Sequence, residues 1–252
     1  MSAAVEVTVA GGIMTITLDR ADKRNALSQA MIGRIAEALA EAELSAEVRV
    51  VAVRGNGPDF CAGADLAELL ASAERTLEEN ERDALGLGEV FLQMRRIPKL
   101  VVAIVHGRAL AGGAGLATAC DLVIASRSAR FGYPEVQRGF VPAMVMTMLR
   151  RSVGEKRAFD LVATGRVVEA DEALQMGLIS RVVEADVLEA EAAALLATLA
   201  DQAPTSMALT KQLFTDLDER SFGDGILLGA RVNALSRRTD DFRRAIAAFL
   251  DK

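Results

Sequence analysis

A strand pattern that occurs twice constrains the fold of this chain most strongly. Residues 48–53 read VRVVAV and residues 100–105 read LVVAIV, and a loop containing glycine leads from each run into an apolar helix. Strands that are apolar on both faces and alternate with helices are typical of a parallel sheet covered by helices on both sides. The sequence therefore predicts an α/β core.

The segments around these runs indicate how the core is completed. Residues 5–10 and 13–18 alternate around Gly11 and Gly12, which predicts a hairpin because both turn residues tolerate positive φ. Apolar residues three and four apart over residues 29–44, after a possible N-cap at Ser28, predict an amphipathic helix. We expect a third short strand at 121–125, with helices dominating from there to the end.

Composition excludes several classes of partner. A net charge of -6, one tyrosine and no tryptophan argue against a nucleic-acid binder, which needs a basic field and stacking groups. Two cysteines, Cys61 and Cys120, are too few for a disulfide framework. The first ten residues do not resemble a signal peptide, and no apolar run approaches the ~18 residues of a spanning helix. We expect a cytoplasmic protein with no membrane partner.

Residues 105–121, VHGRALAGGAGLATACD, place small residues where a strand should become a helix. The spacing from Gly107 to Gly112 matches the start of a P-loop, but Gly113 and Ala114 stand where that motif needs Lys and Ser or Thr. The segment also lacks the G-x-G-x-x-G fingerprint of dinucleotide binding. Nucleotide hydrolysis and hydride transfer are therefore not supported.

Backbone donors offer another explanation for the glycines. The loops FCAGADL at 60–66 and ALAGGAGL at 109–116 each follow a strand and open a helix. The first N–H groups of a helix are unpaired donors, and small side chains let a ligand approach them. Two convergent donors would form an oxyanion hole. The alternative is that glycine and alanine only allow the helices to pack closely on the sheet.

Several motifs together resemble the enoyl-CoA hydratase/isomerase, or crotonase, family over nearly the whole chain. They are DKRNALS at 22–28, FCAGADL, HGRALAGGAGLATACD, FGYPEVQRGFVP at 131–142 and GRVVEADEALQMGLISRVV at 165–183. The resemblance implies a crotonase-like spiral of ββα units over residues 1–203. It also implies a helical C-terminal region for trimerisation over 204–252, beginning near Pro204, and a homotrimer or homohexamer.

The same resemblance assigns roles to individual residues. The substrate would be an acyl-CoA thioester, with no separate cofactor because coenzyme A is part of the substrate. Its carbonyl oxygen would lie between the backbone N–H groups of Ala64 and Gly112. Contacts with the adenine and phosphates of coenzyme A are implied for Lys23, Arg24, Ala62, Asp65 and Leu66. Tyr133 is a separate candidate for a hydrogen bond to the substrate. The alternative for Lys23 and Arg24 is an ordinary solvated turn, and for Tyr133 it is simple packing.

Acid and base groups separate the possible reactions. Hydratases of the family use two glutamates, but Gly115 stands at the first position and only Glu135 is present, in FGYPEV. Adding water calls for two carboxylates, whereas a 1,3 shift of a double bond needs one that removes a proton and returns it nearby. The structural alternative for Glu135 is a carboxylate that favours a helix start after Pro134.

The preferred hypothesis is therefore isomerisation of an enoyl-CoA, with Glu135 as the single acid and base. Two alternatives remain open, namely hydration in the same pocket and a CoA-ester binding protein without catalysis. The single histidine, His106, cannot form a histidine metal cluster and is expected to shape its loop. Cys61 is expected to be a small buried thiol. Met144, Met146 and Met148 fit either the core or an apolar acyl pocket.

Overall fold

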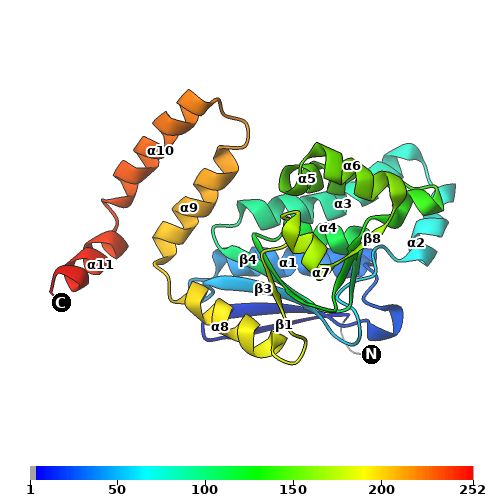
Figure 1. Ribbon diagram of the computed structural model, residues 1–252, viewed down its shortest axis with the longest axis horizontal. Helices are drawn as coiled ribbons and strands as arrows, with labels where there is room; N and C mark the ends of the chain where they lie inside the picture. Colours follow the sequence, from blue (N-terminus) through cyan, green and yellow to red (C-terminus); the bar gives the residue numbers. More distant parts are fainter. Residues whose placement is uncertain (1–3, 252) are drawn as a thin grey trace.

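The computed structural model describes residues 4–251, which form an α/β fold around a six-stranded sheet (Figure 1). The strand order is β1-β2-β3-β4-β6-β9, with β1 and β2 antiparallel and the other neighbours parallel. The strands are β1 Val5–Ala10, β2 Ile13–Leu18, β3 Val50–Gly55, β4 Leu100–Val105, β6 Leu122–Ser126 and β9 Arg181–Val183. The predicted parallel core is confirmed.

The β1–β2 hairpin lies where the sequence predicts it, and two predicted strands begin one or two residues later than expected. Gly11 and Gly12 turn the chain between β1 and β2 with φ of 57° and 78°, as the alternation on either side predicts. The strand expected at 48–53 lies at β3, two residues later, because it pairs with β2 from Val50 onward. The strand expected at 121–125 begins one residue later, at Leu122.

A second, three-stranded sheet lies beside the first. Its strands are β5 Arg108–Leu110, β7 Arg130–Gly132 and β8 Val167–Glu169, with β5 and β7 parallel and β7 and β8 antiparallel. Because β4 and β6 belong to the large sheet while β5 and β7 belong to the small one, the chain winds as repeated ββα units. Helices dominate after residue 125, as expected, but the three short strands β7, β8 and β9 lie among them and were not predicted. Strands of three residues are too short to show a period in sequence.

Helices cover both faces of the large sheet. In chain order they are α1 Gln29–Leu44, α2 Leu66–Ala71, α3 Leu77–Arg96, α4 Gly112–Ala119, α5 Ala143–Val153, α6 Glu155–Thr164, α7 Ala170–Gln175 and α8 Leu188–Ala200. Val50 and Ala52 of β3 pack with α8 on one face, while Val51 and Val53 join the main core on the other. The predicted helix over 29–44 and its Ser28 cap are confirmed, because the Ser28 side chain accepts the N–H of Met31.

The last three helices extend away from the sheets (Figure 1). They are α9 Pro204–Asp216, α10 Phe222–Ser236 and α11 Asp240–Leu250, so this helical region begins at the expected proline. None of the residues of α10 and α11 is buried. That residues 204–252 form a separate region for trimerisation stays a prediction. Of the helices between residues 4 and 251, none has the length and apolar character needed to cross a membrane.

A buried lysine, Lys211, anchors α9 to the core through an ion pair. The Nζ of Lys211 donates to Oδ2 of Asp121 at 2.7 Å and to the backbone carbonyls of Met94 and Lys99 at 2.6 and 2.8 Å. Lys211 is only 5% exposed, so these three acceptors replace its water. The lysine therefore joins the C-terminal helices to the end of α3 and to the residues just before β4 and β6.

Candidate active site

The two glycine loops are held against each other by backbone hydrogen bonds. The N–H of Cys61 donates to the carbonyl of Arg108 at 3.0 Å, and the N–H of Leu110 donates to the carbonyl of Cys61 at 2.9 Å. A Cβ atom at Gly113 would lie 2.3 Å from that same Cys61 oxygen, closer than real Cβ atoms come. Glycine at 113 is therefore what lets α4 begin directly beside the loop at 60–66.

A third segment, the end of the DKRNALS motif, closes on the same loop. The N–H of Ala62 donates to the carbonyl of Arg24 at 3.0 Å, and the N–H of Leu27 donates to the carbonyl of Gly63 at 2.7 Å. Asn25 is fully buried, and its Nδ2 donates to the carbonyls of Asn56 and Asp59, both at 2.8 Å. Sequence analysis assigned Asn25 no role, although it lies within the motif.

Two backbone donors are left unpaired where these loops meet. Within residues 4–251, neither the N–H of Ala64 nor that of Gly112, the first residue of α4, donates a hydrogen bond. The nitrogen of Gly112 lies 3.7 Å from where a Cβ at Gly63 would be, and the nitrogen of Ala64 lies 4.0 Å from where a Cβ at Gly112 would be. The donors are therefore neighbours, as an oxyanion hole requires.

Glu135 lies in a short 3₁₀ helix, Pro134–Arg138, that follows β7. It is 7% exposed, and its Oε2 atom is buried with no hydrogen-bond partner among the described residues. Burial raises the pKa of the Glu135 carboxyl, while its own backbone N–H and the charge of Arg138 offset part of the rise. A buried carboxyl with a free oxygen and a raised pKa is suited to accepting and returning a proton.

The first of the two family glutamate positions, which Gly115 occupies here, is closed. Gly115 is buried in α4, and a Cβ there would lie 2.6 Å from Cγ2 of Val145 and 3.1 Å from Cζ of Phe91. Side chains of α5 and α3 therefore fill the volume that a longer residue would need. The sequence shows the glycine at this position, but it does not show which residues pack against it.

The residues expected near coenzyme A lie around the Ala64 loop. Lys23 and Arg24 are exposed, and the carbonyl of Arg24 holds the N–H of Ala62, so this basic turn and the loop are adjacent. Leu66 begins α2 and is 58% exposed. Asp65 caps α2 by accepting the N–H groups of its first turn. Direct substrate contact by these residues stays a prediction.

Asp65 is also fixed by an arginine that sequence analysis missed. Arg20 donates to Oδ2 of Asp65 at 2.9 Å and to the carbonyl of Ala26 at 2.9 Å. The hydrogen bond from Arg20 holds the pKa of the Asp65 carboxyl below its ordinary value. Because this carboxylate already has an arginine and two backbone donors, its visible role is to brace the loop.

The environment of Tyr133 favours the packing alternative. Its side chain is fully buried, and its hydroxyl lies 2.9 Å from Oγ1 of Thr118 on α4. Burial raises the pKa of this hydroxyl well above its ordinary value. Tyr133 therefore joins β7 to α4 behind the site, and its hydrogen-bonding group already has a protein partner.

Other reactive side chains have structural environments. Burial raises the pKa of the Cys61 thiol to about 12, which keeps it neutral and unreactive. Nε2 of His106 lies 2.8 Å from the carbonyl of Gly57, in agreement with a role in shaping the loop. Over residues 4–251, no group of three His, Cys, Asp or Glu side chains is placed to hold a metal ion.

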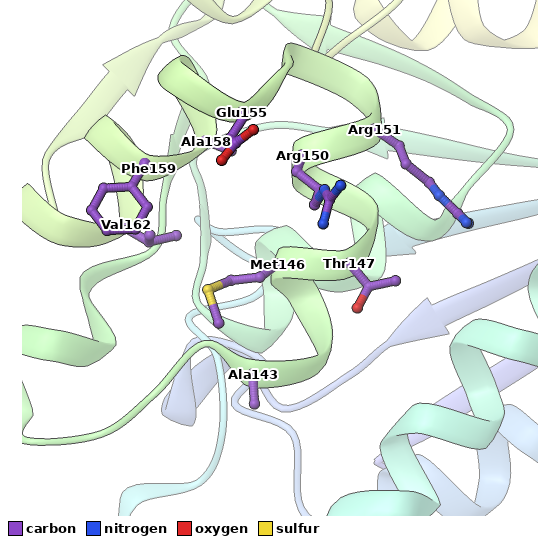
Figure 2. A pocket seen from close by; sticks show the side chains of 9 residues that line it. All are labelled: Ala143, Met146, Thr147, Arg150, Arg151, Glu155, Ala158, Phe159 and Val162. Atoms are coloured by element: carbon purple, nitrogen blue, oxygen red, sulfur yellow. The ribbon is translucent and has the colours of Figure 1, made fainter.

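Two cavities border α5. The first, of about 500 Å³, lies between α5 and α6, and Figure 2 shows its lining. The second, of about 730 Å³, lies between α3, α5 and the connection from the end of α9 to the start of α10, and its walls include Phe91, Met144 and Met148. Neither cavity is lined by Glu135, and Phe91, whose ring lies beside Gly115, is also in the wall of the second cavity.

Comparison with known proteins decides the family. The family model described as Enoyl-CoA hydratase/isomerase matches residues 8–252. The chain belongs to this family. A Thermus thermophilus protein whose name includes the words enoyl-CoA hydratase is 45% identical over 242 residues, covering 96% of both chains. The 2,3-dehydroadipyl-CoA hydratase of Escherichia coli is 32% identical over 241 residues, covering 95% of this chain and 92% of its own.

Solved structures agree with this membership. The enoyl-CoA hydratase of Mycobacterium smegmatis superposes with a TM-score of 0.94 at 32% identity, covering 98% of this chain and 96% of that chain. A Legionella pneumophila protein described as an enoyl-CoA hydratase/isomerase (crotonase) superposes with a TM-score of 0.93 at 31% identity, covering 100% and 97%. The crotonase-like spiral expected for this family member is therefore confirmed, and the protein is an enzyme of the hydratase/isomerase family.

Proposed function

We propose that this enzyme moves the double bond of enoyl-CoA thioesters, with Glu135 as its single acid and base. The thioester oxygen accepts the N–H groups of Ala64 and Gly112. Removing a proton from the α carbon of a 3-enoyl ester places negative charge on that oxygen, where each preorganised donor is worth roughly 3 kcal/mol. Returning the proton at the γ carbon gives the 2-enoyl ester. One carboxylate is enough for both transfers.

The closed volume at Gly115 carries the proposal. Val145 and Phe91 occupy the space in which a second carboxylate would stand, while Glu135 keeps one oxygen free. A site with one proton-transferring group favours a reaction in which the same proton leaves and returns. The raised pKa of Glu135 supports this, because the group must hold the proton between the two steps.

Hydration in the same pocket is the second candidate, and the names of the relatives favour it. The Escherichia coli relative is named a hydratase, and so is a short-chain-enoyl-CoA hydratase of Clostridium acetobutylicum that is 33% identical over 244 residues. If water is added, Glu135 must both activate it and protonate the α carbon, or share this work with a second residue.

The remaining features fit an acyl-CoA substrate. Met144 and Met148 give the second cavity one adaptable apolar wall, opposite charged side chains of the α9–α10 connection, and we propose that this wall contacts the acyl chain. Lys23 and Arg24 offer positive charge to the phosphates of coenzyme A. The exposed apolar side chains of α10 and α11 favour burial between subunits, so we propose a homotrimer or homohexamer, and we propose that it works in the cytoplasm.

The test is incubation of the purified protein with matched 2-enoyl and 3-enoyl CoA esters of several chain lengths. Mass and ultraviolet spectra separate an isomer, which keeps its mass, from a hydrated product, which gains one water. Faster interconversion of the two enoyl esters than hydration supports isomerisation. Efficient hydration without a double-bond shift makes the enzyme a hydratase. Binding without turnover of any ester would leave only the non-catalytic alternative.

A further inference from the structure

Ala111, the residue before Gly112, has an unusual backbone conformation. Three residues other than glycine have positive φ within the described chain, namely Arg24, Asn25 and Ala111. Arg24 lies in the ordinary left-handed region, with φ 52° and ψ 37°. Ala111 has φ 50° and ψ -125°, a combination that a side chain disfavours and glycine tolerates. Strain of this kind persists only where the surrounding structure enforces it.

Hydrogen bonds on both sides hold this conformation in place. The N–H of Ala111 donates to the carbonyl of Gly132 at 2.8 Å, and its carbonyl accepts the N–H of Gly115 at 2.9 Å. The peptide that follows Ala111 is trans, so its N–H, which belongs to Gly112, points opposite to its carbonyl. Because the carbonyl points into α4, the N–H of Gly112 points out of the end of the helix. The torsions of Ala111 therefore set the direction of this donor.

The methyl group of Ala111 contacts the other half of the site. A Cβ atom at Gly63 would lie 2.9 Å from the Cβ of Ala111 and 3.1 Å from the carbonyl of Leu110. The methyl therefore packs directly on the backbone of Gly63, whose own φ is 106°. Gly63 precedes Ala64, which supplies the second unpaired donor. The methyl group of Ala111 thus lies between the two backbone segments that carry the donors.

We propose that Ala111 is a positioning residue, whose strained backbone aims the N–H of Gly112 and whose methyl fixes its spacing from the N–H of Ala64. This inference rests on the proposed function of the two donors. Glycine at 111 would relieve the strain but would also remove the spacer and free the peptide to rotate. The structure therefore gives up stability at this residue to keep the donors preorganised, and stability and activity should respond in opposite directions.

The test compares three variants for thermal stability and steady-state kinetics on the best enoyl-CoA ester. Ala111→Gly should melt at or above the wild-type temperature while kcat falls roughly 10-fold, less than the roughly 10²-fold or greater loss from deleting a donor. KM should stay near that of the wild type. Ala111→Ser keeps the Cβ and should keep wild-type kcat. Ala117→Gly removes a buried methyl elsewhere in α4 and should lower the melting temperature with kcat unchanged.

A spectroscopic measurement separates this inference from the reaction itself. Butyryl-CoA labelled with carbon-13 at its thioester carbonyl reports polarisation by the two donors through its infrared stretching band. Binding to the wild type and to Ala111→Ser should lower the frequency by the same amount, and binding to Ala111→Gly should lower it less. Equal shifts in all three proteins, or wild-type kcat in Ala111→Gly, would overturn the positioning role. If the wild type turns over no enoyl ester, the proposed function fails, and the infrared comparison still decides whether Ala111 positions the donors.

Discussion

Gly115 of α4 and Val145 of α5 are packed so closely that a Cβ at Gly115 would lie 2.6 Å from Cγ2 of Val145. The absence of a second glutamate is therefore part of how α4 and α5 pack, since the valine occupies the volume that the side chain would enter. A carboxylate introduced there would also meet the ring of Phe91. A single replacement at Gly115 cannot by itself create a site with two carboxylates.

We predict that Gly115→Glu destabilises the protein without creating efficient hydration. Glutamate favours a helix over glycine by roughly 0.5–1 kcal/mol, but overpacking costs about 1–3 kcal/mol, and the buried charge adds to this. Adding Val145→Ala should restore part of the stability and raise the share of hydrated product. Denaturant unfolding and the ratio of hydrated to isomerised product measure both effects. Wild-type stability and rapid hydration in the single variant would contradict the packing argument.

The raised pKa of Glu135 predicts how stability depends on pH. Because the folded protein holds this proton more tightly than the unfolded chain, Glu135 favours folding below its unfolded pKa of about 4.3, and the benefit is lost as pH rises through the folded pKa. Glu135→Gln, which does not titrate, should therefore melt at a higher temperature than the wild type at pH 7. The difference should shrink toward pH 4.

Calorimetry across this range checks the prediction, with Glu191→Gln as the control because Glu191 is exposed on α8. The control should follow the wild type at each pH. A stability difference between Glu135→Gln and the wild type that stays constant from pH 4 to pH 7 would mean that the carboxyl is not destabilised by burial.

The buried ammonium group of Lys211, paired with Asp121, predicts a loss of stability when the lysine is truncated. Lys211→Met leaves the Asp121 carboxylate without its cation and two backbone carbonyls without their donor, and because only the lysine is buried we expect a loss of about 1–3 kcal/mol. Adding Asp121→Asn should recover part of this loss. Lys156→Met, at an exposed position of α6, is the control and should unfold like the wild type. Denaturant unfolding measures the free energies, and a Lys211→Met value close to the control would show that the pair contributes little.

Much of this architecture could be predicted because local sequence determines it. The turn at Gly11 and Gly12, the helix after Ser28 and the start of α9 at Pro204 each depend on one or two residues whose torsions or missing donor favour that structure. The short strands of the second sheet could not be predicted, because three residues carry no period. Their pairing depends on partners that are distant in the chain.

Some features of the candidate site could likewise be predicted from the sequence, and others could not. The motifs were enough to select Ala64, Gly112 and Glu135, and to show that Gly115 lacks a carboxylate. The sequence could not show that side chains fill the space beside Gly115, because Phe91 and Val145 belong to helices that lie far from it in the sequence. The strain at Ala111 was hidden for a related reason, since an alanine between Leu110 and Gly112 does not reveal its own torsions.

The central claim is that Glu135 alone moves the proton, and the turnover of Glu135→Gln tests it most directly. The amide keeps the size of the side chain but cannot take a proton at neutral pH, so kcat on the best enoyl-CoA ester should fall by about 10²–10⁴-fold. Affinity for a saturated CoA ester, measured by calorimetry, should stay at the wild-type value because the two backbone donors are unchanged. Near wild-type kcat in a folded Glu135→Gln protein would contradict the account and require another acid and base.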